Sequence, residues 1–237
     1  MIRWFFFLAS LWLSTNVHAY PITAQSWLVA TGDGYILESE NIKHRRPIAS
    51  ITKLVTAMIV LDAGQDLDEY IRPYTRKELV LLSLIQSNNQ ASQTLCEKYP
   101  GGYSSCVAAM NRKAQELGME STHFIDPTGL RAENVSTAED LIKLVLAARK
   151  YDLIREASGM SSMKIKIRKK WLVFSNTNPI IGQRHKFIVS KTGWIRASGG
   201  CIVMLMDTDI GERLVIVLGS KNTHTRIPEA EFLAIRD

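Results

Sequence analysis

The order of strand-like and helical segments is the feature of this sequence that most constrains its fold. Two short strand-like runs at 26–31 and 35–39 flank a Gly-Asp-Gly turn, which predicts a hairpin. Helical patterns follow from 50 to 150, strand-like runs return between 163 and 218, and a closing helix is expected at 228–235. Because strands from both ends of a chain can share one sheet, this order predicts an α/β (α+β) fold with a central antiparallel sheet flanked by helices and a helical subdomain.

The first 19 residues have the pattern of a secretory signal peptide. Arg3 gives a short basic start, an apolar run extends from Trp4 to Leu13, and small residues precede a cleavage site after Ala19. The apolar run is too short to span a membrane, and an uncleaved N-terminal anchor is the alternative interpretation. We therefore expect residues 1–19 to be a signal peptide, residues 20–237 to form a single domain, and the protein to be periplasmic or secreted.

Composition and charge leave several functions open. Charged residues make up 22% of the chain, which is ordinary for a globular protein and argues against disorder. The net charge is +6, and loss of Arg3 with the signal peptide lowers it to +5. This mildly basic balance suits an anionic polymer, although ordinary solvated charge explains it equally well. No stripe of Arg and Lys interleaved with aromatic residues indicates nucleic acid, so no nucleic-acid partner is expected.

The three cysteines fit no metal-binding spacing. Cys96 and Cys106 are ten residues apart across an expected turn, and an exported protein permits a disulfide there without requiring one. Cys201 lies in an apolar strand-like run and is expected to be a buried free thiol. No metal and no organic cofactor is expected.

Ser50 and Lys53 are the first candidates for catalysis. Residues three apart lie on the same face of a helix, so Ser50 Oγ and the Lys53 amine can meet within about 3 Å. A lysine can take the serine proton if burial in a cationic setting lowers its pKa, and a helix start favours developing negative charge. The pattern alone is weak, because Ser161 and Lys164 repeat it and a helix cap followed by a surface lysine is the ordinary interpretation.

A Ser-Asn-Asn triplet and a Lys-Thr-Gly triplet are the next candidates. Ser87 and Asn89 lie in a break between two expected helices, where a hydroxyl and an amide could relay a proton and hold a substrate carbonyl. Taken alone, Ser87 is interpreted more simply as a helix cap. Lys191 and Thr192 end a strand-like run and could bind a carboxylate, while Gly193 would admit a ligand backbone; an ordinary strand terminus is the alternative.

The order and placement of these three motifs separate Ser50 from Ser161. A Ser-x-x-Lys that opens a helix, a later Ser-x-Asn and a Lys-Thr-Gly at a strand together form the signature of active-site-serine β-lactamases and penicillin-binding proteins. With its surroundings, the sequence resembles the D-alanyl-D-alanine carboxypeptidases and endopeptidases, the low-molecular-mass penicillin-binding proteins, and most of all their small periplasmic D,D-endopeptidase branch. Further segments carry this resemblance over nearly the whole chain after residue 19: Arg46 to Ala63, Tyr99 to Tyr103, Met110 to Met119, Asp126 to Leu130, Asn134 to Ala138, and Gly200-Cys201.

The resemblance implies a β-lactamase/transpeptidase-like fold and a serine D,D-peptidase that forms an acyl-enzyme. Ser50 would attack the penultimate D-alanyl carbonyl, Lys53 would accept its proton, and Ser87 would help to pass that proton to the leaving group. The backbone N–H groups of Ser50 and Trp194 would form the oxyanion hole.

The same resemblance implies the substrate-binding residues and the partners. Asn89 would hold the substrate, Lys191 and Thr192 would bind its carboxylate or a β-lactam, and Gly193 belongs to the same strand segment. The implied partners are peptidoglycan peptides, with β-lactam antibiotics as covalent inhibitors. Peripheral association with the membrane or the cell wall is compatible with these partners.

The sequence also departs from the family pattern. The stretch from Lys53 to Ser87 is shorter than usual, mainly between 65 and 75, and the region 159–171 is unusually basic. Endopeptidase activity is favoured over carboxypeptidase activity by overall likeness, and both would use the same nucleophile. A class A β-lactamase is disfavoured, because no Glu has Asn four residues later. A non-catalytic cell-wall-binding homologue is the remaining alternative.

Overall fold

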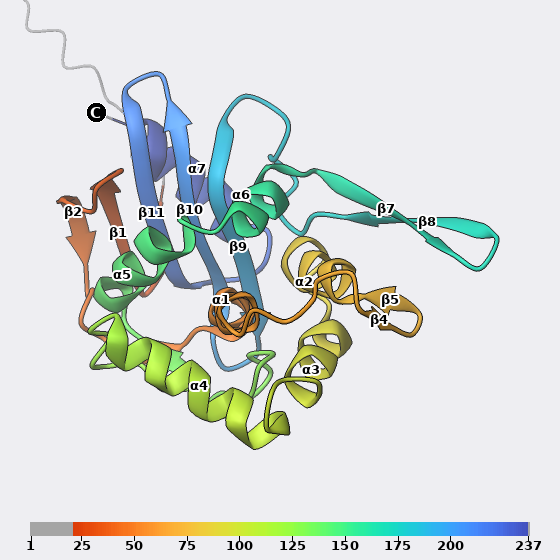
Figure 1. Cartoon of the computed structure of the whole chain (residues 1–237). Coiled ribbons are helices and arrows are strands. Elements are labelled where there is room, and N and C mark those ends of the chain that lie inside the picture. The colour runs from red at the N-terminus through yellow and green to blue at the C-terminus, as the bar shows by residue number, and fades with distance from the viewer. Residues whose placement is uncertain (1–20, 237) are drawn as a thin grey trace, which may run out of the picture.

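The computed structural model describes residues 21–236, and a five-stranded antiparallel sheet lies at the centre of these residues (Figure 1). Its strands are β1 (Ser26–Thr31), β2 (Ile36–Glu40), β9 (Lys186–Ile195), β10 (Gly199–Thr208) and β11 (Gly211–Ser220). Their spatial order is β2-β1-β11-β10-β9, so that strands from both ends of the chain are neighbours. The predicted central antiparallel sheet is confirmed.

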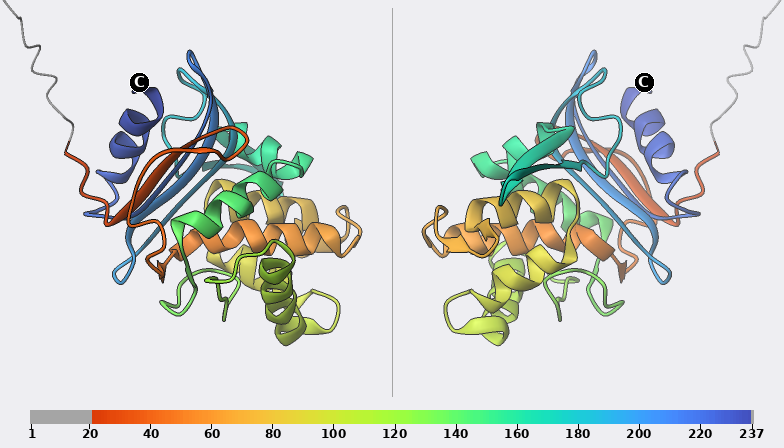
Figure 2. Two further views of the ribbon diagram at one scale, coloured as in Figure 1. Left: turned by 90° about the vertical axis from the view of Figure 1, so that its left-hand side faces the viewer. Right: turned by 90° about the vertical axis from the view of Figure 1, so that its right-hand side faces the viewer.

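Both faces of this sheet are covered. In β11, Leu214, Ile216 and Leu218 face a large apolar core, whereas Val215 and Val217 face a smaller one, because successive strand residues point to opposite faces. Helix α7 (Arg226–Ile235) packs on the smaller core, and Figure 2 shows it across the sheet from the other helices. Burial on both faces explains why the central strands are continuously apolar.

The helices on the opposite face are α1 (Thr52–Asp62), α2 (Arg76–Ile85), α3 (Asn89–Glu97), α4 (Gly102–Glu116), α5 (Ala138–Ala148) and α6 (Asp152–Gly159). Helix α1 runs through the middle of this group, and residues 52–60 are all buried (Figure 1). A helix that is enclosed on all sides needs few polar positions. The spacing of Leu54, Ala57, Met58 and Leu61 predicts one apolar face for this helix, which understates its burial. The predicted arrangement of sheet and helical block is confirmed.

Thr75 with Glu78 and Ser136 with Glu139 both have the Ser/Thr-x-x-Glu spacing that predicts a capping box at a helix start, and the structure agrees with only one of these two predictions. The capping box at Thr75 is confirmed, since its hydroxyl accepts from Glu78 N and the Glu78 carboxylate accepts from Thr75 N. The box predicted at Ser136 and Glu139 is wrong. Thr137 caps α5 instead, because Ser136 is held in the short strand β6 (Val135–Ser136). Helix α6 was not predicted.

Several strand boundaries also differ from the prediction. The strand that was expected to end near residue 190 continues to Ile195, because β10 pairs with it over that whole length. The Lys-Thr-Gly triplet therefore lies inside β9 and not at its end. Strands β7 (Ser162–Ile167) and β8 (Lys170–Ser175) form a separate hairpin outside the main sheet. The remaining short elements are β3 (Arg46–Pro47), which pairs with β6, β4 (Tyr70–Ile71), which pairs with β5 (Tyr74–Thr75), and the 3₁₀ turn η1 (Ala49–Ile51).

Two of the three cysteines are joined, and the third is free. Cys96 in α3 and Cys106 in α4 form a disulfide, which the sequence had left open. Cys201 is buried and free, as predicted. Between residues 21 and 236, no helix is long and apolar enough to cross a membrane. The predicted signal peptide and its cleavage site lie outside the described residues.

Candidate active site

Ser50 lies in η1, immediately before the central helix α1. The preceding residue, Ala49, has a φ of 47°, a left-handed conformation that costs a non-glycine residue roughly 1 kcal/mol. Gly129 packs directly on this turn, since a Cβ at that position would lie 1.9 Å from the Ala49 carbonyl oxygen. The surrounding structure thus holds a strained turn that carries the Ser50 hydroxyl, as is common at functional sites.

The Lys53 amine is the centre of a hydrogen-bond cluster. Its Nζ donates to Ser50 Oγ at 2.8 Å, to Asn89 Oδ1 at 2.8 Å and to the backbone oxygen of Thr128 at 2.5 Å. An ammonium group has three donors, and all three find an acceptor here. The predicted meeting of Ser50 and Lys53 on one side of the helix start is confirmed.

The environment of Lys53 also changes its protonation. Burial lowers the pKa of Lys53 to about 7, because removal from water disfavours the charged amine. The Asp126 carboxylate acts in the opposite direction and limits this fall in pKa. Near neutral pH a large fraction of the amine is therefore unprotonated and 2.8 Å from the Ser50 hydroxyl. These are the properties of a lysine that can act as a general base.

The residues of the second motif have separate roles. Ser87 adopts a φ of 59°, and its Oγ accepts a hydrogen bond from Lys191 Nζ at 2.9 Å. Asn88 caps α3, because its Oδ1 accepts from Ala91 N at 2.9 Å. Asn89 is the residue that contacts Lys53. The helix-cap interpretation of Ser87 is therefore wrong: its neighbour is the cap, and Ser87 itself faces Lys191.

The third motif joins the first two through β9. Besides its bond to Ser87, Lys191 Nζ donates to the backbone oxygen of Thr192 at 2.9 Å. Burial lowers the pKa of Lys191 well below its usual value, and the nearby charges of Lys53 and Arg226 lower it further. The hydroxyl of Thr192 donates to Thr177 Oγ1 at 2.6 Å.

Gly193 brings β9 against the Ser50 turn. A Cβ at this position would lie 3.0 Å from both Ser50 N and the Ile48 carbonyl oxygen, so the strand approaches closely only because glycine has no side chain. The next residue, Trp194, is about half exposed. All eight predicted site residues thus belong to one neighbourhood, and the oxyanion hole assigned to the Ser50 and Trp194 amides stays a prediction.

An aspartate organises the loop opposite Ser50, where the composition of residues 126–129 by itself predicts only a turn. The Asp126 carboxylate accepts from the backbone N–H groups of Thr128 at 2.6 Å, Gly129 at 2.8 Å and Arg131 at 3.1 Å. This network fixes the Thr128 carbonyl that accepts from Lys53 and the glycine that packs on the Ser50 turn. The Asp-Pro-Thr-Gly composition is the signal from which the loop could have been found.

Two other contacts come from segments that are distant in sequence and gave no motif. Thr177 follows β8 and binds Thr192, and Arg226 at the start of α7 donates from Nη1 to the Gly193 carbonyl at 2.6 Å. The guanidinium therefore supports β9 from the side of the smaller core.

The second Ser-x-x-Lys copy has a different structure. Ser161 precedes β7 and Lys164 lies within it, and both side chains are exposed. In an extended strand, residues three apart point to opposite faces. The distinction between Ser50 and Ser161 is confirmed by this difference in secondary structure.

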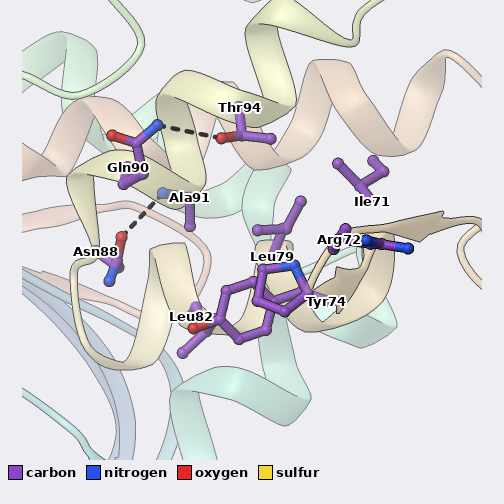
Figure 3. Close-up of a pocket in the computed structure, with 10 residues that line it drawn as sticks. Ile71, Arg72, Tyr74, Leu79, Leu82, Asn88, Gln90, Ala91 and Thr94 are labelled. Carbon is purple, nitrogen blue, oxygen red and sulfur yellow. Dashed lines mark hydrogen bonds between the residues drawn. The ribbon is translucent and has the colours of Figure 1, made fainter. Parts of the chain in front are cut away.

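A cavity of about 250 Å³ adjoins the second motif on the side of α2, α3 and the β4–β5 turn (Figure 3). Asn88 is one of the residues that line this cavity. Lys53 and its hydrogen-bond partners Ser50 and Asn89 do not line it. In Figure 3, Gln90, Ala91 and Thr94 of α3 lie across from Ile71, Arg72 and Tyr74. The cavity therefore borders the loop that carries Ser87 and Asn89 without opening onto Ser50.

We expect Asn88→Ala to lower the free energy of unfolding by about 1 kcal/mol, because the first turn of α3 loses its cap. Denaturant unfolding measures this loss. The control is Gln90→Ala, an exposed position on the same turn that should change stability by less than about 0.5 kcal/mol. Equal stability of the two variants would show that the cap contributes nothing.

Among residues 21–236, no group of three or more His, Cys, Asp or Glu side chains is placed to hold a metal ion.

Comparison with known proteins places this site in a family. The family model of peptidase S11, D-alanyl-D-alanine carboxypeptidase, matches residues 14–72 and 67–222. The D-alanyl-D-alanine endopeptidase of Escherichia coli K12 is 37% identical over 79% of this chain and 68% of its own, and that of Pseudomonas aeruginosa is 36% identical over 83% and 71%.

A solved structure supports the same assignment at the level of the fold. Penicillin-binding protein D2 from Listeria monocytogenes, in its cefotaxime-bound form, superposes with a TM-score of 0.81. It is 24% identical and covers 90% of this chain and 96% of that one. The resemblance inferred from the motifs is confirmed: this chain belongs to the peptidase S11 family of D-alanyl-D-alanine carboxypeptidases.

Proposed function

We propose that the protein hydrolyses D-alanyl bonds of peptidoglycan peptides through an acyl-enzyme on Ser50. The observation that carries this proposal is the 2.8 Å contact between Ser50 Oγ and a buried lysine whose pKa is about 7. Membership of a serine D,D-peptidase family supplies the substrate class.

The first half of the reaction uses the residues around Lys53. The Lys53 amine takes the Ser50 proton as Oγ bonds to the D-alanyl carbonyl carbon, and the carbonyl oxygen becomes an oxyanion that the Ser50 and Trp194 amides stabilise. The proton then passes to the leaving amine, by way of Ser87, as the carbon–nitrogen bond breaks. The hydrogen bond from Lys191 Nζ to Ser87 Oγ supports this route, because it fixes the position of the Ser87 hydroxyl.

The second half regenerates the enzyme. The neutral Lys53 amine takes a proton from a water molecule as the water oxygen bonds to the acyl carbon, the ester bond to Ser50 then breaks, and Oγ receives that proton from Lys53. Lys191 and Thr192 bind the terminal carboxylate, and Asn89 positions the peptide. A β-lactam carries an equivalent carbonyl and carboxylate, so we expect penicillins to acylate Ser50 as well; the cefotaxime-bound relative has the same fold.

We infer that the preferred substrate is a cross-link, so that the protein is chiefly an endopeptidase. The relatives with 36–37% identity are named D-alanyl-D-alanine endopeptidases, whereas Bacillus subtilis DacF, a D-alanyl-D-alanine carboxypeptidase, is 27% identical. Export past the cytoplasmic membrane, with cleavage of residues 1–19, is part of the proposal, because this substrate lies outside that membrane.

Digestion of purified muropeptides tests the substrate preference. Cross-linked dimers should disappear and monomers accumulate, as measured by chromatography with mass spectrometry. Release of D-alanine from pentapeptide monomers while dimers persist would instead identify a carboxypeptidase. Ser50→Ala is the control, because it removes either activity.

A further inference from the structure

The β7–β8 hairpin extends beyond the helices at one end of the molecule (Figure 1). Its strand register pairs Met163 with Phe174 and Ile165 with Leu172 on one face, and the two β7 residues of these pairs are buried. The intervening pairs must lie on the opposite face, because side chains alternate along a strand. The hairpin is thus packed on one face and free on the other.

The free face combines lysines with apolar side chains. Lys164 is paired with Val173, and Lys166 is paired with Trp171. Trp171 is 64% exposed and Val173 is 59% exposed. The Lys166 Nζ lies 5.9 Å from the centre of the Trp171 ring, within the range of a cation–π contact. Leu172, between these two apolar residues in the sequence, is also exposed, but its pairing with Ile165 puts it on the opposite face.

The charge of this hairpin is not neutralised by the rest of the described chain. The five basic side chains are Lys164, Lys166, Arg168, Lys169 and Lys170. None of the five forms a salt bridge with any residue between 21 and 236. Along the sequence, no acidic residue occurs between Glu156 and Asp207. A ligand for this surface must therefore bring its own negative charge.

We propose that this face of the hairpin binds the surface of an anionic phospholipid bilayer. Lysine and arginine are attracted to the phosphate layer, while an indole ring and short aliphatic side chains enter the boundary between headgroups and acyl chains. The two exposed apolar residues of this face, Trp171 and Val173, favour a lipid surface over a soluble polyanion, which needs the cations alone.

The end of the hairpin that joins the rest of the protein lies at the edge of the active site. Strand β8 continues into Thr177, whose hydroxyl accepts from Thr192 in the third motif, and Thr177 N donates to the Ile85 carbonyl at the end of α2. Binding through the hairpin therefore places the active-site edge next to the bilayer surface.

Vesicle flotation with the full chain tests this proposal. The protein should float with vesicles that contain about 30 mol% phosphatidylglycerol and remain largely unbound with pure phosphatidylcholine. Raising the salt from about 0.05 M to about 0.5 M NaCl should weaken binding, because the attraction is screened. All variants share residues 1–20, so any contribution of that segment is the same in each.

Matched variants assign the binding to the hairpin. Lys164→Gln with Lys166→Gln should weaken binding to the anionic vesicles about 25-fold, since each lysine near such a surface contributes about a factor of five. Lys98→Gln with Lys221→Gln removes the same charge from exposed positions elsewhere and should change binding less than about twofold. Trp171→Ala should reduce the binding that persists at high salt. Thermal unfolding checks that every variant is folded.

Three results would overturn the proposal. One is equal loss of binding in the hairpin and control double variants, which would make net charge the cause. Another is equal binding to anionic and neutral vesicles. The third is tight binding of a soluble oligonucleotide, unaffected by Trp171→Ala, without flotation on anionic vesicles. Because flotation does not depend on catalysis, failure here leaves the proposed peptidase activity untouched.

Discussion

Ser50→Ala is expected to abolish penicillin acylation and to reduce peptide cleavage by about four orders of magnitude or more. The variant loses the oxygen that forms the acyl bond, whereas no other hydroxyl is within hydrogen-bond distance of Lys53 Nζ among the described residues. Mass spectrometry after incubation with penicillin measures the adduct, and muropeptide digestion measures cleavage. The protein should remain folded, because the substitution removes one partly buried atom.

Ser161→Ala is the matched control for this experiment. Ser161 has the same Ser-x-x-Lys spacing but is exposed and precedes a strand, so its removal should leave the adduct unchanged. A penicillin adduct that persists in Ser50→Ala would contradict the assignment of the nucleophile. Absence of an adduct in the unaltered protein, together with absence of peptide cleavage, would instead favour the non-catalytic wall-binding alternative.

Lys53→Met is expected to slow acylation by roughly 10²- to 10⁴-fold, which is the usual contribution of a general base. Methionine has nearly the same length and can fill the buried position in α1 without an amine. The stability should change little, because removal of the buried amine, whose charged form burial disfavours, offsets the loss of its three hydrogen bonds. A rate loss without a stability loss distinguishes proton transfer from a packing role, and unchanged acylation would exclude Lys53 as the base.

The pH dependence gives an independent readout of the same residue. Only the neutral amine accepts a proton, and the pKa of Lys53 is about 7, so the acylation rate should rise with pH and reach half of its maximum near pH 7. In Lys53→Met this rise should disappear. A midpoint near 10, the ordinary range for an exposed lysine, would show that burial does not lower the pKa.

Local sequence patterns predicted most of the secondary structure correctly, but they were less reliable where a long-range partner decides the outcome. Thr75 and Glu78 form their capping box because both belong to one turn of chain. Ser136 has the same local pattern, yet pairing of β6 with β3 removes it from the helix start. Strand β9 was predicted too short for a similar reason, since β10 holds it in pairing through Ile195.

The second motif shows that a sequence pattern can select residues without telling what each of them contacts. Nothing in a Ser-Asn-Asn triplet tells which residue caps the helix and which faces the active site. The φ of 59° at Ser87 turns its side chain toward Lys191, which is 104 residues later, and leaves the cap to Asn88. No sequence motif indicated Arg226. Its contact is to the backbone carbonyl of Gly193, which every residue type has, so the contact leaves no pattern in the sequence.

The sequence by itself determined that the Ser50 hydroxyl and the Lys53 amine meet, since a spacing of three residues at a helix start brings them together through local geometry. It also determined the order of strands and helices that defines the fold, through hydrophobic periodicity. Only the tertiary structure decided that Lys53 is enclosed enough to lower its pKa to about 7, that Asp126 limits this fall, and that Lys191 reaches Ser87. Burial and through-space charge depend on residues that are distant along the chain, and no local pattern encodes them.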